Sequence, residues 1–291
     1  MRGVGEAMGA ITIVNALVTG IGSAAGIRWG ARAEIELHPA GSRERWDVEV
    51  ADVARTPLVV CSLEVALSRL APGSSGTGRL EVRSDIPPSR GLKSSSAVSA
   101  AVIESVARAT GARAEAIDVA RLSAEASRRA GLSATGAFDD ALAGLSAGVV
   151  VTDNRTGQLL RTDPLPSDLE VSLVIPAQEH RPSPEWAARF TACRDDGRAA
   201  GDAALAGDWP RAMRLNSELV ERLMGYDYAR ARGAAEDAGA TACGVSGMGP
   251  TLAAVVPRAR TEAVAAALAS VKGERRSIAF SRPREGGERV T

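Results

Sequence analysis

The stretch of residues 80–110 constrains the fold most, because it combines the patterns of a strand, a loop and a helix in direct succession. Apolar and polar side chains alternate over residues 80–84, which is typical of a strand with one buried face. Two prolines, one glycine and several serines occupy residues 86–96. Alanines, valines and an isoleucine then fill residues 97–110 with helical spacing, up to the stop signal of Gly111. The end of this loop therefore lies at the N-terminus of a helix.

A helix N-terminus preceded by small residues is suited to binding an anion. Its first backbone N–H groups have no partner within the helix, and the helix dipole favours negative charge there. The hydroxyls of Ser94, Ser95 and Ser96 add groups that bind phosphate oxygens or a divalent metal. The spacing differs from the common phosphate-binding motif GxxxxGK[ST]. A serine-rich helix cap with a solvent-facing lysine is the alternative, and the loop alone leaves both interpretations open.

Lys93 is one of only two lysines among 35 basic residues, and the other is Lys272. All the remaining basic residues are arginines, so a lysine in this loop stands out from the composition of the chain. Lysine carries a compact point charge, whereas arginine presents a broad planar fork. The bias therefore favours a site that needs a slim cation close to a phosphate.

Two other segments bear on the same site. Residues 244–251 form a second glycine-dense loop before an apolar run, and a tight turn in the core is the alternative interpretation. Residues 135–141 follow a helical pattern over 116–130 and contain two adjacent aspartates. Aspartates in small, apolar surroundings are costly to bury unless they are ion-paired, metal-bound or hydrogen-bonded. A capping or solvent-facing role for Asp140 is the alternative.

Together these segments resemble the motifs of the GHMP kinase superfamily, in the order in which that superfamily carries them. Residues 87–97 are similar to its second motif, PxxxGLGSSAA, and Lys93 in place of a glycine resembles the archaeal shikimate kinase branch. Residues 135–141 resemble the TGAFDDA stretch of that branch, and residues 246–250 are similar to the third motif in its SGxGP form. Residues 9–24 resemble the opening substrate-side segment of the same branch.

The resemblance implies an α+β, two-domain GHMP kinase fold. The N-terminal domain, predicted to span residues 1–155, would hold the phosphate loop in a left-handed βαβ unit, an exception to the usual handedness. The C-terminal domain, residues 156–291, would be ferredoxin-like, with the active site between the two domains. Proline and acidic turn residues between positions 153 and 168 mark the expected boundary.

The resemblance also assigns catalytic and nucleotide-binding roles by position. Asp139 matches the aspartate that orients or deprotonates the acceptor hydroxyl, with Asp140 as the fallback, and Lys93 would neutralise phosphate charge during transfer. The residues expected to bind the ATP phosphates are Pro87, Ser89, Gly91, Leu92, Lys93, Ser94, Ser95, Ser96, Ala97, Ser246, Gly247 and Gly249.

On the substrate side, Asn15, Thr19 and Ser23 are expected to bind hydroxyl groups of the acceptor, together with Asp139. A carboxylate on the acceptor also needs a cation. Arg90 and Arg28 are the candidates for that role, and an ordinary surface position is the alternative for each.

The cofactor implied by the resemblance is Mg²⁺, with ATP as co-substrate. Ser94 or Ser95 and Glu125 are the expected metal ligands, of which Ser95 is the preferred serine. The reaction would be in-line transfer of the γ-phosphoryl group to a hydroxyl, which depends on positioning and charge neutralisation.

The activity implied by the branch is a shikimate kinase, acting on the 3-hydroxyl of shikimate in the chorismate pathway to aromatic amino acids. Two alternatives stay open. One is a GHMP kinase for another small alcohol such as homoserine, pantoate or a mevalonate-like compound. The other is a non-catalytic relative that binds a nucleotide, which would not need an acceptor base such as Asp139.

Composition excludes several other classes. Acidic and basic residues number 35 each, so the basic excess of a nucleic-acid binder is missing. Cys61, Cys193 and Cys243 lie far apart and include no CxxC pair, which argues against a disulfide framework or a zinc ribbon. The two histidines, His38 and His180, lie beside prolines, where surface turns are expected.

The apolar residues 8–27 raise the question of a signal peptide or membrane span. Glycines and hydroxyl residues interrupt this segment, so a strand over residues 10–19 and a tight loop over residues 20–26 fit it better. The chain is therefore expected to be soluble and cytoplasmic, with ATP and a small acceptor as its partners, as a monomer or homodimer.

Overall fold

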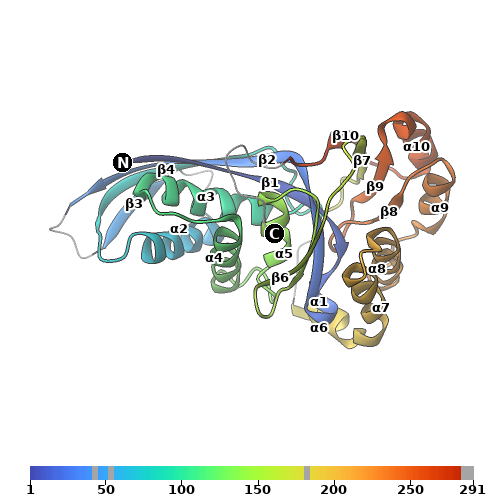
Figure 1. The fold of residues 1–291 in the computed structure, drawn as a ribbon, viewed down its shortest axis with the longest axis horizontal. Coiled ribbons are helices and arrows are strands. Elements are labelled where there is room, and N and C mark those ends of the chain that lie inside the picture. Colours follow the sequence, from blue (N-terminus) through green and yellow to red (C-terminus); the bar gives the residue numbers. More distant parts are fainter. Residues whose placement is uncertain (41–44, 52–55, 180–183, 283–291) are drawn as a thin grey trace.

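The computed structural model describes residues 1–40, 45–51, 56–179 and 184–282, and its strands form two sheets (Figure 1). Figure 1 shows the first sheet extending from the left to the centre of the molecule, and the second sheet with its helices on the right. The fold combines helices with sheets that contain both parallel and antiparallel strand pairs, so the predicted α+β class is confirmed.

The first sheet has the strand order β3-β4-β2-β5-β6, with β1 paired to β2 beside this path. Every neighbouring pair is antiparallel except β3 and β4, which run parallel and are joined through helix α2. The strands are β1 (Arg2–Val14), β2 (Ile21–Pro39), β3 (Trp46–Val50), β4 (Gly76–Ser84), β5 (Val149–Asp153) and β6 (Gln158–Asp163).

Strand β2 is the centre of this sheet, and it begins earlier than the sequence pattern indicated. The tight loop expected over residues 20–26 is wrong, because only Gly20 has the left-handed φ of a turn and Ile21 already starts the strand. Gly22 and Gly26 lie within the strand, where helix α5 approaches so closely that a methyl group would overlap with it. The glycines therefore provide space for a helix.

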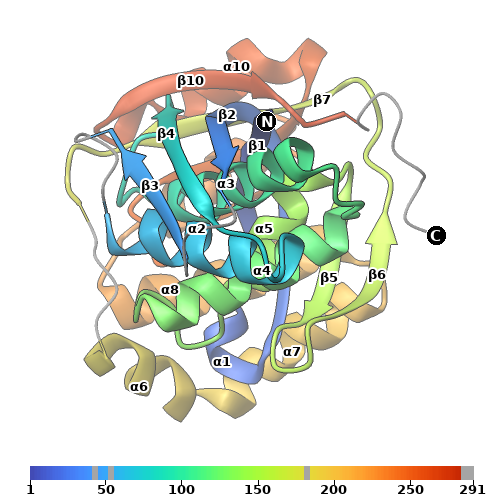
Figure 2. The ribbon, with the colours of Figure 1, turned by 90° about the vertical axis from the view of Figure 1, so that its left-hand side faces the viewer.

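Helices α1 (Ala16–Thr19), α2 (Pro57–Leu70), α3 (Ser94–Thr110), α4 (Ala116–Arg129) and α5 (Phe138–Leu145) accompany this sheet. Figure 2 shows α2, α3 and α4 lying together, and of these α3 packs on β1 and β2. Helix α2 begins at an N-cap whose Thr56 hydroxyl accepts the N–H of Val59, with Pro57 in the first turn. Helix α3 ends at Gly111 in the left-handed conformation, as predicted.

The second sheet has the order β10-β7-β9-β8 and is antiparallel throughout. Its strands are β7 (Leu169–Ile175), β8 (Ala242–Val245), β9 (Leu252–Pro257) and β10 (Glu274–Ala279). Helices α6 (Pro184–Ala192), α7 (Arg194–Leu205), α8 (Trp209–Met224) and α9 (Ala229–Asp237) separate β7 from β8, and α10 (Thr261–Ala267) precedes β10. This strand order and connectivity give the ferredoxin-like arrangement expected for the C-terminal part.

The chain passes from one sheet to the other between Asp163 and Leu169. The boundary expected between residues 155 and 156 falls inside the β5–β6 hairpin of the first sheet. Helices α7 and α8 pack on β1, so the two parts share an extensive contact. None of the helices in the described ranges is both long and apolar enough to cross a membrane.

Strand β1 and helix α3 approach each other closely because β1 carries glycine where it faces the helix. A methyl group on Gly5 would overlap with the carbonyl oxygen of Ala101 and lie 2.5 Å from the backbone nitrogen of Ser105. The backbones of β1 and α3 could move apart only at a considerable cost in free energy. The long pairing of β1 with β2 and the packing of α3 therefore both depend on this glycine.

We expect Gly5→Ala to lower the free energy of unfolding by about 1–3 kcal/mol, because overpacking forces the backbones apart. The matched control is Gly233→Ala in α9, where nothing lies within 4 Å of the added methyl group. That change is expected to raise stability by up to about 1 kcal/mol through helix propensity. Urea unfolding followed by circular dichroism measures both, and equal effects would contradict the close-packing explanation.

Candidate active site

The loop between β4 and α3 has an unusual backbone. Ser89 and Lys93 have φ angles of 56° and 65°, and Gly91 between them has a φ of 80°. Non-glycine residues seldom adopt this conformation, and such strain is concentrated at functional sites. Within the described ranges, only Ala137 joins these two as a non-glycine residue with positive φ, and it directly precedes α5. The strained positions therefore flank two helix N-termini.

Lys93 occupies the N-cap position of α3, without a side-chain cap. The helix begins at Ser94, three residues earlier than the alanine pattern predicted, so all three serines lie in its first turn. Ser95 is exposed and Ser96 is buried. The free N–H groups of this turn are those that the sequence analysis expected to face an anion.

The second glycine-rich loop, residues 246–251, holds the first loop in place. The hydroxyl of Ser246 donates to the carbonyl oxygen of Gly91 at 2.7 Å and accepts the N–H of Thr12 at 3.1 Å. The N–H of Gly247 donates to the hydroxyl of Thr12 at 2.8 Å. Strand β1, the phosphate loop and the second loop therefore meet at one serine.

Two stacked tyrosines, which the sequence analysis did not identify, support the second loop from the far side. The rings of Tyr226 and Tyr228 lie 5.3 Å apart and are nearly parallel. Their hydroxyls donate to the carbonyl oxygens of Met248 and Pro250, at 2.9 and 3.1 Å. Burial raises the pKa of both tyrosines, so both hydroxyls remain protonated donors. Gly249 packs directly on the Tyr226 ring.

The two adjacent aspartates lie in the first turn of α5, where the helix dipole favours negative charge. A carboxylate oxygen of Asp140 lies 3.0 Å from Nζ of Lys93, and both side chains are only 13% exposed. This ion pair joins the N-terminus of α5 to that of α3. It also brings together two of the segments singled out from the sequence.

Asp139 is almost completely buried, with 4% of its surface exposed. Burial raises the pKa of its carboxyl group to about 7, and the charge of Asp140 acts in the same direction, while Lys93 and Asn154 oppose the shift. A carboxyl group with a pKa near neutrality is suited to accept a proton at physiological pH. The surroundings of Asp139 thus fit the base role expected for it.

Asn154 holds Asp139 in position and was missed in the sequence analysis. Its side-chain amide donates to a carboxylate oxygen of Asp139 at 2.7 Å, and its own oxygen accepts the N–H of Asp139 at 3.2 Å. The hydroxyl of Thr152 donates to the same oxygen at 2.7 Å, which fixes the orientation of the amide. On the opposite side, a methyl group on Gly22 would overlap with the Asp139 carboxylate.

The three residues expected to bind acceptor hydroxyls differ in how far their side chains are already engaged within the protein. Asn15 caps α1 by accepting the N–H of Leu17 at 3.0 Å, so its side-chain oxygen is already used. The hydroxyl of Thr19 accepts the N–H of Ile21 at 3.2 Å. Ser23 is fully buried and follows Gly22, so its side chain points to the other face of β2 from Asp139.

The two arginine candidates lie in different places. Arg90 is within the phosphate loop, 17% exposed, with its nearest carboxylate, that of Glu179, at 3.6 Å. The nitrogen of this ion pair, Nη1, is buried and makes no hydrogen bond to any described residue. Arg28 lies six residues along β2 from Gly22, about 20 Å at the rise of an extended strand. Only Arg90 is therefore close to the loops.

The expected metal ligands differ in how well they fit Mg²⁺. Both carboxylate oxygens of Glu125 contact arginines, at 3.3 Å for Arg69 and 2.5 Å for Arg129. Its ligand role remains a prediction that requires these ion pairs to break. The exposed hydroxyl of Ser95 and the carboxylate of Asp140 are oxygen donors beside the loop, the type that Mg²⁺ prefers alongside phosphates.

No group of three or more His, Cys, Asp or Glu side chains that could hold a metal ion by itself occurs in the part of the chain that the structure describes. A metal that arrives with nucleotide phosphates needs only one or two protein ligands. The donor set thus fits a nucleotide-bound Mg²⁺ better than a resident ion.

The geometry supports a specific chemistry. The α3 N-terminus and Lys93 provide positive charge for phosphates, and the adjacent α5 N-terminus provides a buried carboxyl group with a pKa near neutrality. An anion bound at the first helix would lie beside a base at the second. This is the arrangement needed to transfer a phosphoryl group to a hydroxyl.

Comparisons with known proteins point the same way. The model of the GHMP kinases N terminal domain matches residues 57–148, and that of the GHMP kinases C terminal domain matches residues 201–273. A shikimate kinase of Methanothrix thermoacetophila is 38% identical over 94% of this chain and 92% of its own length. A shikimate kinase of Archaeoglobus fulgidus is 35% identical over 89% of this chain and 86% of its own length.

Solved structures share the fold at low identity. Homoserine kinase from Cytophaga hutchinsonii is 18% identical with a TM-score of 0.69, over 97% of both chains. Mevalonate kinase from Methanococcus jannaschii is 14% identical with a TM-score of 0.72, over 97% of this chain and 99% of the other. At such identities the likeness concerns the fold alone.

The contact between Asn154 and Asp139 predicts a measurable pKa. We expect the Asp139 carboxyl group to titrate near pH 7, as followed by its ¹³C resonance in NMR spectra. Asn154→Ala should raise this pKa further by about one unit, because a hydrogen bond to the charged form is lost. As the control, Thr156→Ala removes a hydroxyl of the same β5–β6 turn and should leave the pKa unchanged. An unshifted pKa in the Asn154 variant would show that this amide does not stabilise the carboxylate.

Proposed function

The chain belongs to the GHMP kinases, and from that membership we propose that it is a shikimate kinase, transferring the γ-phosphoryl group of ATP to the 3-hydroxyl of shikimate. The observation that carries the proposal is the buried Asp139 carboxyl group, next to the Lys93–Asp140 ion pair at the phosphate loop. A protein that only bound a nucleotide would not need a carboxyl group with a pKa near neutrality at that point.

Nucleotide binding is assigned to the two loops. The phosphates of ATP would lie against the first turn of α3, where unpaired N–H groups, Lys93 and the serine hydroxyls supply positive charge and donors. The hydroxyl of Ser246 holds the carbonyl of Gly91, which has a left-handed φ, so this cradle is formed before ATP arrives. A preformed cradle favours catalysis because little reorganisation is needed during transfer.

Asp139 is assigned to bind and deprotonate the acceptor hydroxyl. Its carboxylate would align the hydroxyl with the γ-phosphate and accept its proton as the new P–O bond forms. Asn154 donates to one carboxylate oxygen, which leaves the other oxygen, the one facing Gly22, for the hydroxyl. Asp140 would hold the ammonium group of Lys93 between the two helices until the phosphates take over part of that contact.

Mg²⁺ would enter with ATP, and its chemistry is to neutralise charge on the phosphate oxygens during transfer. Ser95 and Asp140 are the residues that would contact it most directly, with Ser94 as a neighbouring hydroxyl. Glu125 would join them only after release from Arg69 and Arg129.

The carboxylate of shikimate is assigned to Arg90. Its guanidinium group is mostly buried, and Nη1, which lies 3.6 Å from the Glu179 carboxylate, makes no hydrogen bond among the described residues. An incoming carboxylate would replace Glu179 as the partner of this nitrogen and form the hydrogen bond that it lacks. Asn15, Thr19 and Ser23 stay proposed contacts for the hydroxyl groups, although Asn15 and Thr19 would first give up local hydrogen bonds.

Another small alcohol is the second candidate for the acceptor. The solved structures with the same fold include homoserine and mevalonate kinases, at identities that support the fold alone. The curated relatives matched at 32–38% identity over most of the chain are shikimate kinases, and they favour shikimate.

The purified protein with ATP and Mg²⁺ should turn over with shikimate at least about a hundredfold faster than with homoserine, pantoate or mevalonate, because unpaired polar groups penalise a wrong acceptor. Coupled measurement of ADP release gives the rates. Asp139→Asn should reduce kcat by about a hundredfold or more while ATP still binds. Glu236→Gln, a change of the same kind on α9, is the control and should leave kcat unchanged.

The outcomes separate the alternatives. Turnover with a different alcohol would overturn shikimate as the acceptor but retain the phosphoryl transfer mechanism. ATP binding without turnover of any acceptor would favour a non-catalytic role, and failure to bind ATP would contradict the assignment of the phosphate loop.

The pKa of Asp139 predicts how kcat/KM for shikimate depends on pH. Below pH 7 its carboxyl group is mainly protonated and cannot accept a proton, so kcat/KM for shikimate should fall tenfold for each pH unit well below about 7. In Asn154→Ala the inflection should move to higher pH by about one unit. A pH profile that is flat from pH 5 to 8 would show that Asp139 is not the base.

A further inference from the structure

A surface groove lies behind α5, at the end of the helix opposite to Asp139. It has a volume of about 340 Å³ and is formed by β1, β2, α3, the C-terminal end of α5 and the residues after β10. Pockets of a few hundred Å³ are typical of small-molecule sites. Of the residues expected to bind ATP or the acceptor, only Arg28 takes part in it.

Three arginines line this rear groove, and two of them have no partner among the residues that the structure describes. Arg28 and Arg282 are exposed and make no ion pair or hydrogen bond with any residue in the described ranges. Arg108 donates to Glu104 at 2.8 Å. The other acid at the groove, Glu6, pairs with Arg32. Positive charge therefore exceeds negative charge there.

The remaining walls suit a small organic molecule. Met8 and Leu145 provide apolar surface. The hydroxyl of Ser146 is buried without a hydrogen-bond partner among the described residues, and the backbone oxygen of Ser146 is already taken by Ser281 at 2.9 Å.

The C-terminal end of α5 opposes an anion, since a helix end carries about half a negative charge. The two unpaired guanidinium groups outweigh it, with a full positive charge each. Arginine also binds carboxylate and phosphate through paired hydrogen bonds, which a helix end cannot cancel. The balance of charge still favours an anionic ligand.

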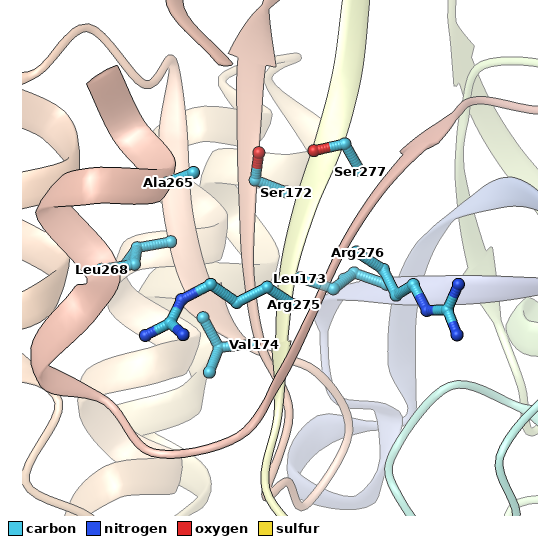
Figure 3. Close-up of a pocket in the computed structure, with 8 residues that line it drawn as sticks. All are labelled: Ser172, Leu173, Val174, Ala265, Leu268, Arg275, Arg276 and Ser277. Carbon is cyan, nitrogen blue, oxygen red and sulfur yellow. The ribbon is translucent and has the colours of Figure 1, made fainter. Parts of the chain in front are cut away.

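A second cavity, between β7, β10 and α10, is lined by two arginines that already have partners within the protein (Figure 3). Its volume is about 100 Å³. Arg275 donates to the carbonyl oxygens of Ala269 and Val271, and Arg276 pairs with Glu274. Figure 3 shows the two guanidinium groups pointing in opposite directions, so they do not converge on a ligand.

We propose that the rear groove binds a small metabolite carrying two anionic groups, carboxylate or phosphate, held between Arg28 and Arg282. The proposal is independent of the kinase activity proposed above. The ligand would contact the end of α5, whose other end, about 12 Å away for eight residues of helix, carries Asp139. Gly144 packs directly on the backbone of Met8, so this end of α5 cannot move closer to β1.

Methionine methyl groups report on the two anion sites separately. Met8 lines the rear groove, and Met248 lies in the loop beside the phosphate site. In NMR spectra of protein labelled with ¹³C-methyl methionine, titration with inorganic phosphate and with succinate should shift the Met8 resonance in a saturable way. A response to succinate supports a ligand with two anionic groups, whereas a response to phosphate alone would show a site for a single oxyanion and overturn the proposal.

Arg28→Gln with Arg282→Gln should weaken the Met8 response about tenfold or more and leave the Met248 response to phosphate unchanged. Both side chains are exposed and unpaired in the described ranges, so the variant should fold normally. Arg79→Gln with Arg83→Gln removes the same charge from β4 and should behave as the wild type. A Met8 resonance that neither probe shifts, or that shifts equally in the groove variant, would overturn the proposal.

Discussion

The ion pair between Lys93 and Asp140 connects two helix N-termini that would otherwise have little reason to face each other. Each helix end alone attracts negative charge, and α5 already carries two carboxylates in its first turn. Lys93 offsets one of them, which allows Asp139 to be buried beside it at the cost of a raised pKa. The phosphate binding and proton transfer that we propose would therefore depend on one shared cation, and its slim side chain fits a lysine in an otherwise arginine-rich chain.

Small residues control how closely the elements of the site approach. Gly22 leaves room for the Asp139 carboxylate, Gly91 for the backbone of Ser246, and Gly249 for the ring of Tyr226. Each contact joins segments far apart in the sequence. The catalytic geometry thus results from close backbone packing as much as from the polar side chains themselves.

The sequence was sufficient to predict what depends on local pattern. The strand–loop–helix unit around Lys93 and the helix stop at Gly111 follow from spacing and turn residues, whereas helix α5, which begins at the aspartate pair, was not predicted. It was insufficient where contacts are long-range. Asn154 lies in a segment that resembled a domain boundary, and the early start of β2 was hidden because its glycines suggest a loop until α5 is seen against them. Glu125 was assigned as a metal ligand by the family resemblance, and the sequence could not show its two arginine partners.

The hydrogen bond from Ser246 to Gly91 spans 155 residues of chain. A ribosome adds about 5–20 residues per second, so the phosphate loop emerges roughly ten seconds or more before the serine that braces it. During that interval a nascent chain has a helix N-terminus and a strained loop without their support. The brace on this loop is consequently acquired only after Ser246 has been synthesised.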